Sequence, residues 1–576
     1  MKYKINIEII RYLLLFILVS APFFNGLKDP VPLFVFETLV FILSFIFMYF
    51  FKVKKTALDL PITLFFTFLA ISTSTSVYFN ASLNTMLMLL SFVFLFYVTI
   101  SVYDDKFKKY FYYCFISVSF IISIIIMVQS FLSYIPKATL PNPNLAAGYI
   151  ACASTIIFSY TISNKISIKF KILNVIFFLF LCFSIILTHS RGGFFALICG
   201  ISFNIILKFK KWGIILTIFT ALFTFVILPA NFVKNIAKID TGDTYSLKRS
   251  EIWKSAIKII IEKPFFGTGP GNFELLFFKY NFPVDNGISR FGKHTRFAHN
   301  EFLQIAAESG IFSLFAFIFV IFIIFKNMKG NPVFTSALIA IISHSLVDFN
   351  LHLPAITIIA IFLTADILYK IEYNDNNINS KYLKIFLLII IVFNSINFFF
   401  KPFDSVKYKK TADKLIDRYP EKSLELYKKV IEFSPDDFEY RRIIGELFYS
   451  NNNKLQAIEN LNISIKLNPN SPFAITSLAN IYFNLKEFNK AEPYFLRALE
   501  IEPNYLLPRY FLAKIDERRG KIDSATNEYK NIILTYNYFK NNYMSFSGYE
   551  KLLFYIDISS VNNSLKSISE SKGKTR

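Results

Sequence analysis

The sequence predicts an all-α protein in which a polytopic helical membrane domain is followed by an α-solenoid. Two observations support this fold class. Apolar runs of about 18 or more residues recur before residue 400, in a chain that is 54% hydrophobic with a mean hydropathy of +0.46. Beyond residue 400 these runs stop, and small residues and prolines recur at a step of 34 residues instead. We therefore expect a membrane domain over 1–400 and a repeat domain over 401–545, followed by a polar C-terminal tail over 546–576.

About twelve or thirteen apolar segments are long enough to form membrane-spanning helices. They lie at 9–27, 31–51, 60–79, 84–103, 111–132, 144–163, 169–188, 192–208, 212–229, 307–325, 332–350, 353–370 and 381–400. Lysine-rich loops follow every second span, as at Lys52 and Lys54 and again at Lys106 and Lys108, and the loops between carry almost no cations. Because Lys and Arg accumulate in cytoplasmic loops, the N-terminus is predicted to be cytoplasmic. The long connection at about 230–306 and the repeat domain are then extracytoplasmic.

The charge of the chain follows largely from this topology. The net charge is +22, and because the lysines cluster in cytoplasmic loops we expect no nucleic-acid partner. The outer connection is also basic, with eleven Lys or Arg against six Asp or Glu between 230 and 298. A connection of that length is exempt from the charge rule, so its basic character predicts an anionic ligand.

The repeat domain resembles the tetratricopeptide repeat. Three sets of positions keep the 34-residue step: Pro435, Pro469 and Pro503; Ala457, Ala491 and Ala525; and Gly445, Ala479 and Ala513. Small residues allow two helices of a unit to approach closely, and the prolines end each unit. About four units fit within 404–537. Such an array presents a concave surface, so a protein partner is expected there.

The histidines gather on one side of the predicted topology. His189, His294, His299 and His352 lie at or beyond the outer membrane face, and His344 lies about two turns inside it. Ionisable groups inside membrane helices are costly, so we treat their positions as functional hypotheses.

Two arginines accompany these histidines. The stretch "LTHSRGGFFAL" (187–197) places His189 and Arg191 at an outer turn, where Gly192 and Gly193 allow close helix packing. Arg191 would serve either as an interface anchor or as a bidentate donor to a phosphate. Arg249 is expected in the first turn of an amphipathic helix, whose pattern is typical of a helix that lies along a membrane surface.

The stretch "FAHNEFLQIAAESG" (297–310) predicts a helix start. Asn300 is a good N-cap, which holds His299 where its imidazole can exchange protons with solvent or substrate. Glu301 and Glu308 are seven residues apart and share one side of the helix. We expect Glu308 to be a hydrogen-bond partner at the mouth of the helix rather than an acid catalyst.

The stretch "HSLVDFNLH" (344–352) spaces His344, Asp348 and His352 four residues apart. That spacing fits metal ligation, but the helix is predicted to end near Asn350, so a hydrogen-bonded pair of His344 with Asp348 is favoured over a metal site. We expect the glycines of "GTGPGN" (267–272) to form turns, since the stretch lacks the Lys-Ser/Thr of a phosphate-binding loop.

Together these segments resemble the O-antigen ligase and polymerase family of bacterial membrane glycosyltransferases, over about residues 60–370. The matching pieces are "PNPNLAAGYIA" (141–151), "THSRGG" (188–193), "RSEIWKSAIKIIIEKPFFGTGPGNF" (249–273), "HNEFLQIAAESG" (299–310) and "HSLVDFNLHLPA" (344–355). The resemblance implies a GT-C-like fold in the bacterial cytoplasmic (inner) membrane and an undecaprenyl-diphosphate-linked glycan as donor. It further implies that Arg191 and Arg249 hold the diphosphate and that His299 is the catalytic base, in an inverting transfer without metal or cofactor.

The acceptor stays open at this point. A glycolipid, a glycan or a protein would each fit, so repeat-unit polymerase and protein O-oligosaccharyltransferase are alternatives to ligase. From other classes, a solute transporter and a noncatalytic assembly scaffold are alternatives. His189, Asn300, Glu308, His344 and Asp348 are the residues expected to bind substrate, with membrane lipids around them.

Overall fold

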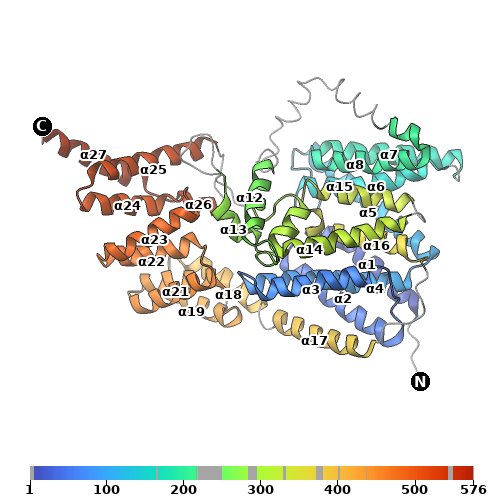
Figure 1. The fold of residues 1–576 in the computed structure, drawn as a ribbon, viewed down its shortest axis with the longest axis horizontal. Helices are drawn as coiled ribbons and strands as arrows, with labels where there is room; N and C mark the ends of the chain where they lie inside the picture. The colour runs from blue at the N-terminus through green and yellow to red at the C-terminus, as the bar shows by residue number, and fades with distance from the viewer. Residues whose placement is uncertain are drawn as a thin grey trace.

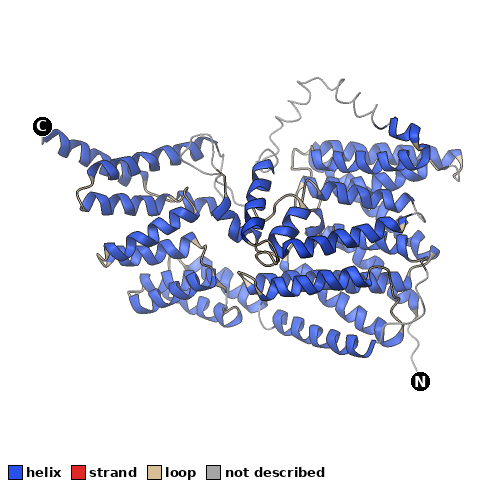
Figure 2. Cartoon of the chain, viewed as in Figure 1, coloured by secondary structure: helices blue, strands red, loops and turns tan. Residues whose placement is uncertain are grey.

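The computed structural model describes residues 6–163, 166–215, 217, 249–282, 295–328, 332–371, 380–399, 402–435, 437–542 and 549–574. Every regular element in these ranges is a helix, which confirms the predicted all-α class (Figure 2). The first part contains α1 (Ile7–Ser20), α2 (Pro30–Phe50), α3 (Asp59–Ser74), α4 (Phe79–Val102), α5 (Asp105–Phe131), α6 (Pro143–Thr161), α7 (Ile168–Leu187), α8 (Arg191–Phe209), α12 (Arg249–Glu262), α13 (Phe273–Tyr280), α14 (Glu301–Lys326), α15 (Pro332–Ser345), the 3-10 helix η4 (Asn350–His352), α16 (Pro354–Leu368) and α17 (Ser380–Phe399). The second part contains α18 (Pro402–Leu415), α19 (Pro420–Phe433), α20 (Phe438–Ser450), α21 (Lys454–Leu467), α22 (Pro472–Asn484), α23 (Phe488–Ile501), α24 (Leu506–Arg518), α25 (Ile522–Asn542), α26 (Tyr549–Phe554) and α27 (Ile558–Lys574).

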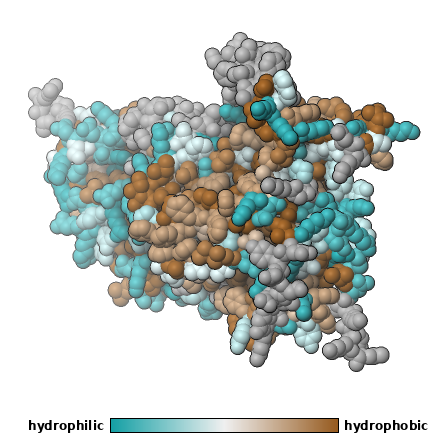
Figure 3. All heavy atoms as spheres, turned by 45° about the vertical axis from the view of Figure 1, so that its right-hand side comes forward, coloured by the Kyte–Doolittle hydropathy of each residue, from teal (hydrophilic) through white to brown (hydrophobic). Residues whose placement is uncertain are grey.

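The protein is a multi-pass membrane protein. Six of its described helices are long and apolar enough to cross a membrane, namely α2, α4, α5, α7, α8 and α14. The helices α3, α15 and α16 and residues Tyr382–Asn394 are apolar but shorter. These helices run side by side (Figure 1), and hydrophobic surface occupies the middle of the space-filling view, with hydrophilic surface toward its left and right sides (Figure 3). Nearly all of the expected span at 212–229 lies outside the described residues, and so does His294.

Helix α6 is largely buried within the membrane bundle. Fourteen of its residues are buried, and it packs against α7, α8 and α15. A Cβ atom added at Gly193 of α8 would lie 2.3 Å from the Ala147 Cβ of α6, closer than carbon atoms can approach. The close packing predicted for the Gly192–Gly193 pair is therefore confirmed, and it brings the start of α8 against α6 and against the His344 ring of α15.

Helix α14 is interrupted to receive the loop that follows α12. Gly310 lies inside α14 with φ of 80°, and the Ile311 N–H donates to the Pro264 carbonyl over 2.8 Å instead of continuing the helix. The loop glycines Gly267, Gly269 and Gly271 all have positive φ, which confirms that they are turn residues. The Gly269 N–H in turn donates to the Glu308 carbonyl over 2.8 Å. These bonds tie the loop after α12 to the first turns of α14.

We expect Gly310→Ala to loosen this junction. Its new Cβ would lie 2.0 Å from the Phe265 carbonyl oxygen, in addition to the strain of a left-handed alanine. Gly520→Ala is the matched control, because Gly520 has a φ of +77° and nothing within 4 Å of its Cβ position. Thermal unfolding of the purified variants should show a much larger fall in Tm for Gly310→Ala. Equal falls would mean that the backbone conformation alone, and not the packing of the loop, explains the glycine.

The apolar face of the amphipathic helix α12 does not lie against the membrane surface. The expectation that this face contacts the membrane was therefore wrong. Ile252, Ala256 and Ile259 are completely buried in a core formed with α13 and α14, which includes Phe273 and Ala307. Protein side chains, rather than lipid headgroups, therefore cover its apolar face. The expectation that Arg249 occupies the first turn is confirmed, since Arg249 is the first residue of α12.

The second part is a solenoid of antiparallel helix pairs, as the repeat predicts. The alanines at the 34-residue step, Ala457, Ala491 and Ala525, are fully buried where paired helices meet. The segment 546–576, expected to be a polar tail, instead contains α26 and α27. Phe554 and Val561 are buried in a core shared with α25, so the periodic packing of apolar residues extends beyond the recognisable repeats.

The solenoid lies against the end of the membrane bundle that carries α12 and α13 (Figure 1). Tyr78, at the α3–α4 turn, makes an edge contact with Phe438 of α20, with ring centroids 5.5 Å apart. Tyr538 of α25 packs against the core formed by α12 and α13. The repeats thus lie beside the connection that contains α12 and α13.

Candidate active site

A buried carboxylate joins two of the predicted site residues. Asp348 lies between α15 and η4 and its side chain is fully buried. One of its oxygens, Oδ2, is 3.1 Å from Nη2 of Arg249, and the other, Oδ1, is 3.1 Å from Nδ1 of His299. Three segments that are far apart in the sequence therefore meet at one side chain. We call Arg249, His299 and Asp348 the carboxylate cluster.

Local structure explains why each residue of the carboxylate cluster lies there. Asn300 caps α14 by accepting from the Phe302 and Leu303 amides, which confirms the predicted N-cap, and its Nδ2 donates to the Leu346 carbonyl over 2.9 Å. This second bond ties the start of α14 to the segment that carries Asp348. His299, just before the cap, has a φ of 51°, an uncommon conformation that surrounding packing must hold.

The contacts of Asp348 set both its charge and the tautomer of His299. Burial raises the pKa of Asp348, but the bond to His299 and the charge of the Arg249 guanidinium outweigh this and hold the pKa well below its usual value. Because an ionised carboxylate only accepts hydrogen bonds, the His299 proton lies on Nδ1. Nε2 is then the nitrogen that can take up a proton, as a general base requires.

Part of the Arg249 guanidinium remains available to an anion. Its side chain is 14% exposed, and its buried Nε has no hydrogen-bond partner in the part of the chain that the structure describes. A guanidinium carries five donors, and the bond to Asp348 uses one Nη nitrogen. The group can therefore hold Asp348 and a second anionic partner at once.

The predicted pair of His344 with Asp348 does not form. Asp348 bonds to His299 and Arg249 instead, and both ring nitrogens of His344 lack a partner among the described residues. The His344 ring fills a slot between Gly148 of α6 and Gly192 of α8, where an added Cβ would lie 2.4 Å and 2.6 Å from its two nitrogens. His344 thus packs beside the carboxylate cluster, and the glycines of two other helices make room for it.

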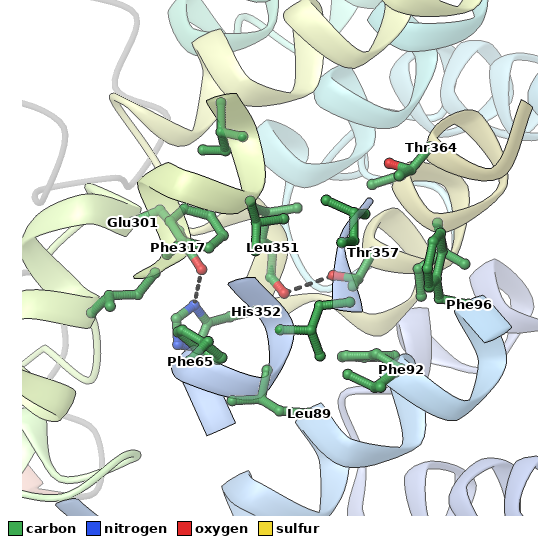
Figure 4. Close-up of a pocket in the computed structure, with 18 of the residues that line it drawn as sticks. Phe65, Leu89, Phe92, Phe96, Glu301, Phe317, Leu351, His352, Thr357 and Thr364 are labelled. Atoms are coloured by element: carbon green, nitrogen blue, oxygen red, sulfur yellow. Dashed lines mark hydrogen bonds and ion pairs between the residues drawn. The ribbon is translucent and has the colours of Figure 1, made fainter. Parts of the chain in front are cut away.

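A second pair, which the sequence did not predict, joins Glu301 and His352. His352 Nδ1 lies 2.8 Å from Glu301 Oε1 (Figure 4). Burial lowers the pKa of His352, but the carboxylates of Glu301 and Glu308 outweigh burial and raise the pKa to about 9. His352 is therefore charged at neutral pH. The presence of His352 in a predicted outer turn was the available signal, but nothing in the spacing pointed to a partner 51 residues away.

Glu308 acts as a hydrogen-bond acceptor between segments. Its Oε1 accepts from the Phe273 amide over 3.0 Å and from Gln304 Nε2 over 2.8 Å. The predicted role as a partner at the helix mouth agrees with these two bonds. Whether Glu308 also binds substrate stays a prediction.

Arg191 and His189 lie at the α7–α8 turn and are exposed. No hydrogen bond or ion pair within the described ranges joins either residue to the carboxylate cluster. Gly192, the neighbour of Arg191, contacts the His344 ring, so the first turn of α8 lies beside the segment that ends in Asp348. The positively charged side chain of Arg191 is therefore exposed near the carboxylate cluster, but Arg191 does not belong to the cluster.

An apolar cavity of about 260 Å³ lies on the other side of α15. Its walls come from α3, α4, α14, α15, η4 and α16, and most lining side chains are Phe, Leu, Ile or Val. Figure 4 shows the Glu301–His352 pair at one end, with Phe96 and Thr364 at the other. An aromatic stack connects this end to the carboxylate cluster: the Phe297 ring lies 5.1 Å from His352 and 4.1 Å from Phe349, which in turn lies 5.1 Å from His299.

Two parts of the chain match known families. Residues 176–318 match the O-antigen ligase family, and residues 472–505 match the tetratricopeptide repeat. The chain carries an O-antigen ligase domain. The matched part of the ligase domain contains Arg191, Arg249 and His299, whereas Asp348 lies beyond it.

More distant similarities involve smaller or weaker matches. The human protein O-mannosyl-transferase TMTC1 is 28% identical over 112 residues, which cover 18% of this chain and 12% of that protein. The chain thus spans about an eighth of that relative's length. Among solved structures, MamA matches with a TM-score of 0.23 and 18% identity, over 30% of this chain and 99% of MamA. Yeast Tom70 matches with a TM-score of 0.22 and 10% identity, over 85% of this chain and 94% of Tom70.

Proposed function

We propose that the protein transfers a glycan from a polyprenyl-diphosphate-linked donor, of the undecaprenyl type, to an acceptor hydroxyl. The observation that carries the proposal is the carboxylate cluster, in which Asp348 holds His299 and Arg249 within 3.1 Å of its two oxygens. This arrangement supports the assignment of His299 as a general base beside a cation that has donors to spare. The resemblance to O-antigen ligases supplies the donor class.

The proposed reaction is an inverting displacement. His299 Nε2 takes the proton of the acceptor hydroxyl while the hydroxyl oxygen forms a bond to the anomeric carbon. The bond between that carbon and the diphosphate oxygen breaks, and the lipid diphosphate leaves with the electron pair. Asp348 stabilises the imidazolium that forms, because its carboxylate already accepts the Nδ1 hydrogen bond.

The leaving group needs positive charge on the diphosphate side. Arg249 offers the edge of its guanidinium that Asp348 does not use, and Arg191 offers an exposed guanidinium at the first turn of α8. Cations placed where negative charge develops lower the barrier without rearranging at the moment of reaction. The proposal assigns this role to the two arginines and so requires no metal ion.

The test is glycan transfer by the purified, reconstituted protein, with EDTA present, from a polyprenyl-diphosphate oligosaccharide to a panel of lipid, glycan and protein acceptors. Wild type should transfer, and Arg191→Ala should lose most of the rate. Lys258→Ala is the matched control, since it removes one exposed cation from α12 without touching the carboxylate cluster. Transfer that EDTA abolishes would contradict the arginine assignment. Solute uptake in the same vesicles, without transfer to any acceptor, would favour a transporter instead.

We also propose that the carboxylate cluster and the solenoid lie on the extracytoplasmic side of the bacterial inner membrane. The lysine pattern supports this, and so does the packing of the solenoid beside α12 and α13. In intact cells a membrane-impermeant maleimide should label Lys530→Cys in α25 but not Lys109→Cys in α5, both exposed positions. The reverse labelling would place the solenoid in the cytoplasm.

A further inference from the structure

The apolar cavity is large enough for a hydrocarbon chain. Its volume of about 260 Å³ exceeds that of apolar cavities of ~150 Å³, which stay dry and bind small hydrophobic molecules. Its walls include Phe65, Leu89, Phe92, Phe96 and Phe317 (Figure 4). Such a lining offers mainly dispersion contacts to an alkyl chain, with a few hydroxyl groups such as those of Thr357 and Thr364 between them.

The polar end of the cavity offers no free cation to a phosphate. Among the described residues that line this end, His352 is the basic one, and it lies 2.8 Å from Glu301, with Glu308 also in the lining. Glu301 is 95% buried, and its Oε2 has no hydrogen-bond partner among the residues that the structure describes. A buried carboxylate oxygen without a donor is costly, and a hydroxyl group of a ligand would satisfy it. This end therefore suits a head group that carries hydroxyls and no phosphate.

The cavity lies on the opposite side of α15 from His344 and from the first turn of α8, which carries Arg191. Leu338, Ile341 and Ile342 of α15 face the cavity, whereas His344 faces Gly148 and Gly192 on α6 and α8. Within the described ranges, no residue of α6, α7, α8 or α12 lines the cavity. If Arg191 and Arg249 hold the donor, the cavity remains free to bind a different lipid.

We infer that the cavity holds the alkyl chain of the acceptor, and that the acceptor is a neutral glycolipid, such as a glycosyl diacylglycerol. The inference rests on the proposed function, because a lipid in this cavity is an acceptor only if the protein transfers glycans. The head group would lie against Glu301 and His352 and extend over the Phe297–Phe349 stack, which leads to His299. Its hydroxyl would thereby reach Nε2 of the proposed base while its chain stays anchored among α3, α4, α14 and α16.

The test uses photoactivatable lipids on the full-length protein in lipid nanodiscs. One probe is a glucosyl diacylglycerol with a diazirine in its acyl chain, a second is phosphatidic acid with the same chain, and a third is a diazirine-bearing polyprenyl diphosphate. Mass spectrometry locates the labelled peptides. We expect the glucosyl lipid to label α4 and α16 about tenfold more than the phosphatidic acid, a difference of ~1.4 kcal/mol. Lys258→Ala, an exposed position outside the cavity and the carboxylate cluster, should label as wild type does.

Ala360→Phe places a ring in the cavity from α16 and should lower labelling by the glucosyl lipid about tenfold. Ala360→Ser, which hardly changes the volume, is the matched control, and the Tm of both variants checks that they fold. Stronger labelling of α4 and α16 by the polyprenyl diphosphate would overturn the inference and assign the cavity to the donor. Absence of labelling by the glucosyl lipid, with glycan transfer to proteins intact, would overturn it and leave the proposed function standing. Labelling as expected without glycan transfer to any acceptor would support the cavity's ligand class and refute the proposed function.

Discussion

Replacing His299 by alanine or glutamine is expected to lower the rate of glycan transfer by about 10²–10⁴-fold, the range typical for loss of a general base. Alanine removes the ring, whereas glutamine keeps a donor for Asp348 but has no nitrogen that can accept a proton at neutral pH. Comparing the two variants separates proton transfer from packing. Initial rates in the reconstituted transfer assay measure the effect, with thermal unfolding as the control for folding.

The glutamine variant is the decisive one. His299 has a left-handed backbone conformation and its ring makes an edge contact with Phe349 at 5.1 Å, so alanine also removes packing. Both variants should bind the polyprenyl diphosphate donor like wild type, because the arginines are intact. A glutamine variant that retains a large share of the wild-type rate would show that the ring has a structural role and that another group takes the proton.

Asp348→Asn is expected to have an effect of comparable size, with transfer falling roughly 10³–10⁴-fold, as happens when the carboxylate that orients a catalytic histidine is neutralised elsewhere. The asparagine amide can accept or donate, so it no longer selects the Nδ1 tautomer of His299. It also leaves the half-buried charge of Arg249 without its ionic partner 3.1 Å away. Breaking a buried ion pair in this manner costs about 3–5 kcal/mol of stability, so Tm should fall as well.

Asp366→Asn is the matched control for Asp348→Asn. Asp366 is also fully buried and pairs with a cation, Lys108 Nζ, at 3.1 Å. It lies in the last turn of α16, whereas Asp348 precedes the first, so the two carboxylates flank opposite ends of one helix. Asp366→Asn should lower Tm but leave the transfer rate per folded molecule nearly unchanged. Equal loss of rate in both variants would mean that destabilisation, not the carboxylate cluster, explains the effect of Asp348.

Much of the fold could be predicted because it depends on local patterns. Runs of apolar residues determine where helices cross the membrane, and the step of 34 residues determines where the solenoid packs its alanines. Asn300 at an N-cap and glycines in the 267–271 turns are likewise properties of a few consecutive residues. The segment 546–576 was misassigned as a tail because its periodic pattern is weak in isolation and its apolar residues are buried only against α25.

The sequence by itself identified candidates for the site: an arginine at a helix start, a histidine before an N-cap, and an Asp–His stretch near a predicted outer turn. Only the tertiary structure decided which of them pair. Asp348 lies 49 residues from His299 and 99 from Arg249, and its nearer candidate, His344, is held elsewhere by two glycines of other helices. The Glu301–His352 pair and the burial of the apolar face of α12 are equally long-range. Local spacing specifies the direction of a side chain along its own helix, but the packing of several helices determines which charge it meets.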